Sequence, residues 1–211
     1  MDQKLLNTAY LLSIFTIVYN IGEGIVSIFY GITDQTLALF GFGVDSFVEV
    51  ISGFGIAHMI YRMKKAEVNQ RDQFEIKALK ITGTSFYILA IGLVIGSFAA
   101  LITQTKPEST FAGVIISLVS IAIMYFLMIL KLRTGKKLKS DAIIADANCT
   151  KTCLILSVVL FASSLGYLRS HNIFIDSIGS VAIAYFAFQE GREAFEKAKN
   201  ISLSCNCLKN H

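Results

Sequence analysis

Four residues in two apolar segments have the types and the spacing of metal ligands. Asp45 and Glu49 lie four residues apart, and so do Cys149 and Cys153 further along the chain. Residues at i and i+4 share one face of a helix, and two ligands at this spacing can grip a single ion, as in the HExxH motif. Two such helices would supply the four ligands of a tetrahedral divalent ion.

The chemistry of these four side chains favours a borderline or soft ion. Carboxylates that face thiols suit Zn²⁺, our first expectation, and Cd²⁺ also fits because thiolate is a soft ligand. An ion would relieve the repulsion between Asp45 and Glu49, which could scarcely both ionise without it. Since ligands must lose protons to bind a metal, the site predicts metal–proton exchange. We expect the metal to be a substrate, with no prosthetic group and no enzymatic activity.

Each pair also has a plainer interpretation. A cysteine in a membrane helix is often a small packing residue, and Asp45 with Glu49 could be a polar pair that binds nothing. A membrane thiol enzyme is a further alternative, but thiols on successive turns of one helix have poor disulfide geometry. No cofactor motif accompanies them. The two faces taken together favour a metal site of Asp45, Glu49, Cys149 and Cys153.

Three more polar residues are candidates for an ion path. Asn20 and Glu23 lie three residues apart, and Asp146 shares the helix face of Cys149 and Cys153. Ionisable groups inside bilayer helices are costly and are therefore functional candidates. The alternative for Glu23 is a carboxyl group that is hydrogen-bonded within the bundle.

Two cysteines near the end of the chain, one acidic residue and a pair of glycines complete the set of candidates. Cys205 and Cys207 could capture a soft metal at the cytoplasmic side, or belong to an exposed tail or a palmitoylated anchor. Asp176, near the start of the last apolar segment, is expected to be structural because an acid there favours the helix dipole. Gly92 and Gly96 have the GxxxG spacing that permits close helix approach, although glycine is also common in membrane helices.

The composition indicates that lipid surrounds the segments that carry these residues. The 211 residues are 54% hydrophobic and only 16% charged, with a mean hydropathy of +0.61, whereas soluble domains are about one quarter charged. Crossing the hydrocarbon takes about 20 mostly apolar residues. The qualifying segments are Leu6–Ile32, Leu37–Tyr61, Ile76–Thr103, Phe111–Leu130, Asp141–Leu168 and Ile173–Phe195. We expect an all-α membrane protein, with a six-transmembrane-helix bundle at residues 1–200 and a short cytoplasmic tail at residues 201–211.

Basic residues predict the orientation of the bundle. They concentrate in the connections after the second and fourth segments and are few in the intervening ones. Basic connections stay cytoplasmic, so we expect both termini in the cytoplasm of a multi-pass protein of the cell (inner) membrane. The chain has no basic stripe with interleaved aromatic residues, so nucleic acid is not expected as a partner.

The pattern resembles the membrane domain of cation diffusion facilitators, a family of divalent-metal transporters. The second helix of that family commonly carries a stretch like "SLALLADALHSLSD". Here "TLALFGFGVDSFVE" aligns with it from Thr36 without a gap and places Asp45 and Glu49 at the two ligand positions. The fifth-helix pattern of the family resembles "ADALHTRSD", and "ADANCTKTC" places Cys149 and Cys153 at its ligand positions.

Other positions both extend and limit the resemblance. Asn20, Asp176 and Gly191 match residues of the family's first and sixth helices, whereas Phe42 stands where the family's "ADA" triplet has its acid. The paired cysteines and the glutamate leave the usual selectivity for zinc or manganese open. We expect the membrane domain alone, without the soluble C-terminal domain common in the family.

The resemblance implies a function and a set of partners. It implies a six-helix protein, often a homodimer, that exports metal from the cytoplasm by proton antiport. The expected partners are therefore a divalent metal ion, protons, the lipid bilayer and a second copy of the chain. The alternative function is a non-transporting membrane metal sensor, or a partner-binding subunit with the same bundle.

Overall fold

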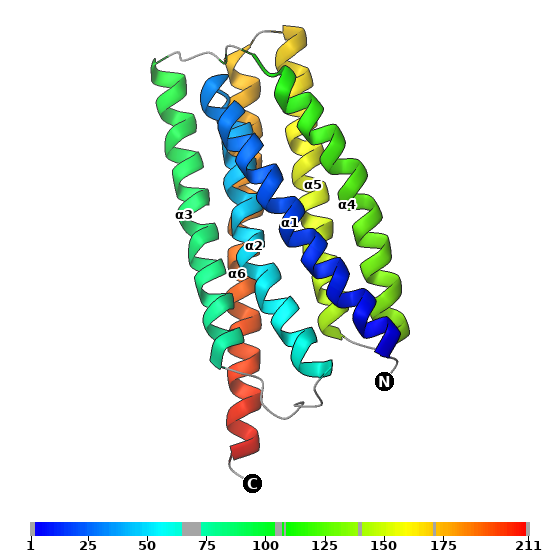
Figure 1. The fold of residues 1–211 in the computed structure, drawn as a ribbon. Helices are drawn as coiled ribbons and strands as arrows, with labels where there is room; N and C mark the ends of the chain where they lie inside the picture. Colours follow the sequence, from blue (N-terminus) through cyan, green and yellow to red (C-terminus); the bar gives the residue numbers. More distant parts are fainter. Residues whose placement is uncertain are drawn as a thin grey trace.

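The described part of the chain is a bundle of six helices without strands (Figure 1). The computed structural model describes residues 3–64, 73–103, 107, 109–138, 141–170 and 172–209, without the side chains of residues 52, 59, 62–64, 73–78, 82, 141, 142, 145, 173 and 201–209. The helices are α1 (Gln3–Thr33), α2 (Leu37–Lys64), α3 (Gln73–Thr103), α4 (Phe111–Leu138), α5 (Asp141–Ser170) and α6 (Ile173–Lys209). Each contains one segment expected from the sequence, which confirms the all-α fold. The expected domain boundary at residue 200 falls inside α6 and stays a prediction.

Five helices, α1 to α5, are long and apolar enough to cross a membrane. Helix α6 runs along the bundle against α3 and α2 (Figure 1), but it does not meet this criterion within the described residues. Its outward face is nonetheless apolar, with exposed large side chains at i+3 and i+4 spacing: Phe174, Ile178, Val181, Tyr185 and Phe188. Its polar residues Asp176, Ser177 and Ser180 are buried. The lower apolarity of α6 thus comes in part from residues that face the other helices.

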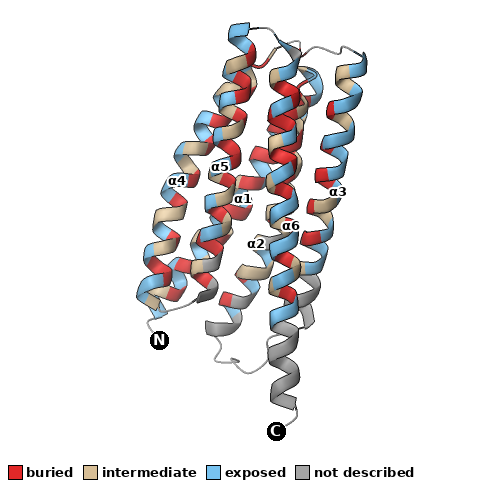
Figure 2. Cartoon of the chain, turned by 180° about the vertical axis from the view of Figure 1, so that it is seen from behind, coloured by how far each residue is buried: buried red, intermediate tan, exposed pale blue. Residues whose placement is uncertain are grey.

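The bundle carries large apolar side chains on its outside and buries small polar residues beside its apolar core. Exposed positions of α1 and α3 hold large apolar residues, among them Leu11, Phe15, Phe29, Ile91, Ile95 and Phe98, and exposed strips follow each helix in Figure 2. Buried serine pairs join helices: Ser97 to Ser180 between α3 and α6 (2.6 Å), and Ser120 to Ser157 between α4 and α5 (2.8 Å). Lipid favours this arrangement, because apolar tails cover the outside and hydrogen bonds join the interior.

The helices pack most closely as three pairs, α1 with α2, α3 with α6 and α4 with α5, and α2 also contacts α3, α5 and α6. The main apolar core lies between α2, α3, α5 and α6. Phe42 is buried in this core, so the position that holds an acid in the resembling family is filled here by an apolar ring.

Helices α1 and α2 approach each other most tightly at glycines. A Cβ atom on Gly31 would lie 2.6 Å from the backbone nitrogen of Phe40, and one on Gly43 would lie 2.8 Å from that of Ile28. Backbone atoms cannot rotate away, so these positions need glycine. In contrast, a Cβ atom on Gly92 would meet nothing within 4 Å, and one on Gly96 would meet only the side chain of Leu37. The GxxxG pair therefore does not mark a close approach at Gly92.

Asp176 on the neighbouring helix α6 stabilises the beginning of α2. Its carboxylate accepts hydrogen bonds from the backbone N–H groups of Leu37 (3.1 Å) and Ala38 (3.4 Å). The first N–H groups of a helix have no partner within it, and a negative charge there is favourable. Asp176 thus has a structural role at the beginning of α2, and it also lies in the first turn of its own helix, α6.

Replacing Gly31 with alanine tests the tight packing of α1 against α2. We expect Gly31→Ala to lower the free energy of unfolding by about 1–3 kcal/mol, because the added methyl group forces the two backbones apart. Thermal unfolding in detergent measures the effect. Gly92→Ala is the matched control and should leave the transition at or slightly above that of the wild type. Equal transition temperatures for the two variants would show that the helices do not cross as described.

Candidate metal centre

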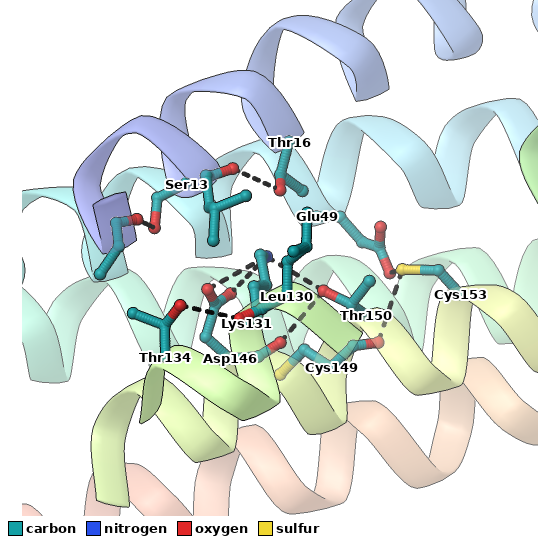
Figure 3. A network of polar contacts seen from close by, with 12 residues as sticks. Ser13, Thr16, Glu49, Leu130, Lys131, Thr134, Asp146, Cys149, Thr150 and Cys153 are labelled. Carbon is teal, nitrogen blue, oxygen red and sulfur yellow. Dashed lines mark hydrogen bonds and ion pairs between the residues drawn. The ribbon is translucent and has the colours of Figure 1, made fainter. Parts of the chain in front are cut away.

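Glu49 is the residue at which three helices meet. The Cys153 thiol on α5 donates a hydrogen bond to Glu49 Oε1 on α2 (Figure 3). The amide of Asn20 on α1 donates to the other carboxylate oxygen, Glu49 Oε2, at 3.0 Å. Asn20 and Cys153 are buried, and Glu49 is half-buried. The structure therefore brings together one residue from each expected ligand pair, with the expected asparagine beside them.

Two buried oxygen atoms near this contact make no hydrogen bond within the described residues. They are Oδ1 of Asn20 and Oδ1 of Asp45. Asp45 is 2% exposed and lies one helical turn from Glu49. Buried polar atoms are nearly always paired with protein or water. These two oxygens are thus available to bind a cation or a water molecule.

The four expected donors do not converge on one point. Helices α2 and α5 run in opposite directions (Figure 1), so Asp45 and Cys149 lie toward opposite ends of the bundle from Glu49 and Cys153. Each separation of four residues is about 6 Å along a helix axis. Accordingly, the described residues contain no group of three or more His, Cys, Asp or Glu side chains that could hold an ion. The assignment of all four residues as ligands stays a prediction.

A cavity of about 80 Å³ adjoins the contact between Glu49 and Cys153. A water molecule needs only about 10–15 Å³ of such space, so the cavity has room for several waters or a hydrated ion. It is lined by Thr16, Asn20, Glu49, Gly53, Ile56, Leu79, Phe86, Lys131, Asp146, Cys149, Thr150, Cys153, Glu190, Ala194 and Lys197. Ile56, Leu79 and Lys197 belong to the halves of α2, α3 and α6 at the end where α1 begins (Figure 1). The cavity therefore extends from the contact toward that end, past the half-buried Cys149.

Asp146, a candidate for the ion path, forms an ion pair with Lys131. The Lys131 ammonium on α4 lies 3.0 Å from each carboxylate oxygen of Asp146 and 3.0 Å from Thr150 Oγ1 (Figure 3). Both partners are buried. An isolated charge in apolar surroundings is very unfavourable. The ion pair therefore explains how both charged side chains can be buried. Asp146 lines the cavity, but its carboxylate is already occupied.

Lys131 and Glu190 line this cavity but were not among the residues predicted from the sequence. Lys131 was missed because its place in a basic run predicted a solvated connection. The spacing of residues along α4 could have indicated that Lys131 faces inward. Lys131 continues a series of buried residues at alternating spacings of three and four: Gly113, Ser117, Ser120, Met124, Leu127, Lys131 and Thr134. It is therefore an inward-facing residue of α4.

Glu23 is hydrogen-bonded inside the bundle, as the alternative interpretation held. Tyr19 donates to its Oε1 at 2.7 Å, and Ser46 donates to its Oε2 at 3.1 Å. Glu23 is buried, and a role in an ion path stays a prediction. The side chains of Cys205 and Cys207 lie outside the described part of the structure, so metal capture by them is likewise a prediction.

These features define a multi-pass integral membrane protein with a cavity among its helices that two thiols and several polar side chains line. The family model described as the cation efflux transmembrane domain matches residues 13–201. The chain therefore belongs to the cation efflux family, whose members are the cation diffusion facilitators. A comparison with curated proteins gives no match. Members of this family transport divalent metal cations across membranes, which supports cation transport in general as the function of this chain.

The accessibility of the two thiols tests the course of the cavity. We expect a water-soluble maleimide to modify Cys149 several times faster than Cys153, because Cys149 is half-buried along the cavity whereas Cys153 is buried and bonded to Glu49. Mass spectrometry of the Cys205→Ser/Cys207→Ser variant, which keeps only these two thiols, measures both rates. Equal rates, or faster reaction at Cys153, would contradict the described cavity.

Proposed function

We propose that the protein exports Zn²⁺, or a softer divalent ion such as Cd²⁺, from the cytoplasm by proton antiport. The observation that supports this proposal is the buried contact between the Cys153 thiol and the Glu49 carboxylate beside a cavity. A cation that replaces the proton between Cys153 and Glu49 gains a sulfur ligand from α5 and an oxygen ligand from α2.

The donor set supports the choice of ion. Mixed sulfur and oxygen ligands suit Zn²⁺ and Cd²⁺, whereas Mg²⁺, Ca²⁺ and Mn²⁺ prefer oxygen alone. Two more donors lie one turn from the contact in opposite directions along the bundle: Cys149 and Asp45. In our proposal the ion meets Cys149 first and binds at Glu49 and Cys153. It then leaves past Asp45, whose Oδ1 has no hydrogen-bond partner within the described residues.

The same contact supports coupling to protons. The hydrogen of the Cys153 thiol lies between sulfur and Glu49 Oε1, and a thiol must lose its proton to bind a metal. Each ion that binds Cys153 therefore releases at least one proton, and the ion must leave before that proton returns. A shared site of this kind couples the two fluxes without a separate proton path.

The direction of transport rests on the placement of basic residues and on the family. The cavity extends toward the end of the bundle where α4 finishes with Lys136 and Lys137, and basic ends stay cytoplasmic. We therefore infer that this end, with both termini, is cytoplasmic and that the protein lies in the cell (inner) membrane. Assembly as a homodimer is inferred from the resemblance to the family alone.

Metal flux into liposomes tests the proposed function. We expect vesicles with an acidic interior to take up Zn²⁺ or Cd²⁺ in exchange for protons, and a protonophore to abolish the accumulation. Glu49→Gln and Cys153→Ser should each lower the flux by at least about 100-fold, since even groups that only orient a ligand contribute 10–100-fold to metal affinity.

The control for the flux measurement is Glu196→Gln, which removes an exposed carboxylate from α6 and should transport normally. Unchanged flux in the Cys149→Ser/Cys153→Ser variant would refute the site. Metal binding without flux in the wild type would instead support the alternative, a non-transporting sensor or partner-binding subunit.

A further inference from the structure

The ion pair of Lys131 and Asp146 occupies the wall of the cavity that contains Glu49 and Cys153. Lys131 is 1% exposed, and its ammonium has three acceptors at 3.0 Å: both oxygens of Asp146 and Thr150 Oγ1 (Figure 3). It donates hydrogen bonds to Asp146 Oδ1 and Thr150 Oγ1 and forms an ion pair with Asp146 Oδ2. The ammonium is held in one place and covers both oxygens of the Asp146 carboxylate.

The location of Asp146 would otherwise make it a ligand. It precedes Cys149 by three residues and Cys153 by seven on the same face of α5, and all three line the cavity. A free carboxylate there would add a further anionic oxygen donor to those of Glu49 and Glu190, which also line the cavity. Hard cations such as Mn²⁺ bind best to such oxygen-rich sets, whereas sulfur favours softer ions.

We propose that Lys131 is a specificity-determining residue that withholds Asp146 from the transported cation. With Asp146 occupied, an ion in the cavity meets the thiols of Cys149 and Cys153 and two carboxylates, those of Glu49 and Glu190. That set favours Zn²⁺ and Cd²⁺ over Mn²⁺. The inference rests on the proposed function, in which the cavity binds the cargo ion.

A purely structural role for the pair makes a different prediction. If Lys131 only joined α4 to α5, its loss would lower stability but leave the ratio of Cd²⁺ to Mn²⁺ affinities unchanged. If the positive charge itself repelled hard ions, removing both charges would raise the Mn²⁺ affinity as much as removing Lys131 alone. The affinity ratio in single and double variants therefore separates the three roles.

The experiment measures the affinities of purified protein for Cd²⁺ and Mn²⁺ by calorimetry. All variants carry Cys205→Ser and Cys207→Ser, so that only the cavity thiols remain, and the pH is the highest that the protein tolerates, where competition by protons is weakest. We expect Lys131→Met to gain about tenfold or more in Mn²⁺ affinity, the effect that one group at a metal site can have. Lys131→Arg and Lys131→Met/Asp146→Asn should keep the wild-type ratio.

The outcomes are distinct. An unchanged ratio in Lys131→Met, or a gain in Mn²⁺ affinity that persists in the double variant, overturns the inference. If Lys131→Met does not fold, Lys131→Gln replaces it, and if neither folds, a gain in Mn²⁺ affinity in the double variant still rejects the inference. A wild-type protein that binds neither Cd²⁺ nor Zn²⁺ would refute the proposed function itself.

Discussion

The rest of the centre depends on the two hydrogen bonds that the Glu49 carboxylate accepts. The carboxylate lies within an apolar bundle and is held from two sides, by the Asn20 amide and by the Cys153 thiol. A carboxylate in such surroundings must be paired or neutral, so α1 and α5 are required to present donors at one level of α2. The close approach of α1 to α2 at Gly31 and Gly43 brings Asn20 within reach.

The same constraint governs the other buried charges. Lys131 and Asp146 satisfy each other between α4 and α5, and Asp176 is stabilised by backbone N–H groups at the beginning of α2. Removing one partner of a buried pair costs about 3–5 kcal/mol. Glu49, Asp176 and the pair of Lys131 and Asp146 are therefore held by their partners. In contrast, Asp45 retains an oxygen without a hydrogen bond in the described part of the chain. This contrast is one reason why we propose a cation site in the region around Asp45 and Glu49.

The sequence predicted the helices and the inward faces but not the position of each residue along the bundle axis. Twenty or more apolar residues in a row leave little choice but a helix in lipid, and spacing fixes which residues share a face. Spacing says nothing of how far one helix is displaced along another. Glu49 and Cys153 are in contact, while Asp45 and Cys149 lie one turn away in opposite directions. Lys131 was missed because the end of the helix was placed too early, at Leu130 instead of Leu138.

The central claim is that the transported ion binds both sulfur and oxygen between α2 and α5. X-ray absorption spectroscopy of the Cys205→Ser/Cys207→Ser protein loaded with Zn²⁺ tests it most directly, because all remaining sulfur ligands except methionine come from Cys149 and Cys153. We predict a mixed first shell, with at least one Zn–S distance near 2.3 Å and oxygen or nitrogen ligands at about 2.0–2.2 Å. The sulfur contribution should disappear in Cys149→Ser/Cys153→Ser. A first shell of oxygen and nitrogen alone in the protein that retains both thiols would contradict the account.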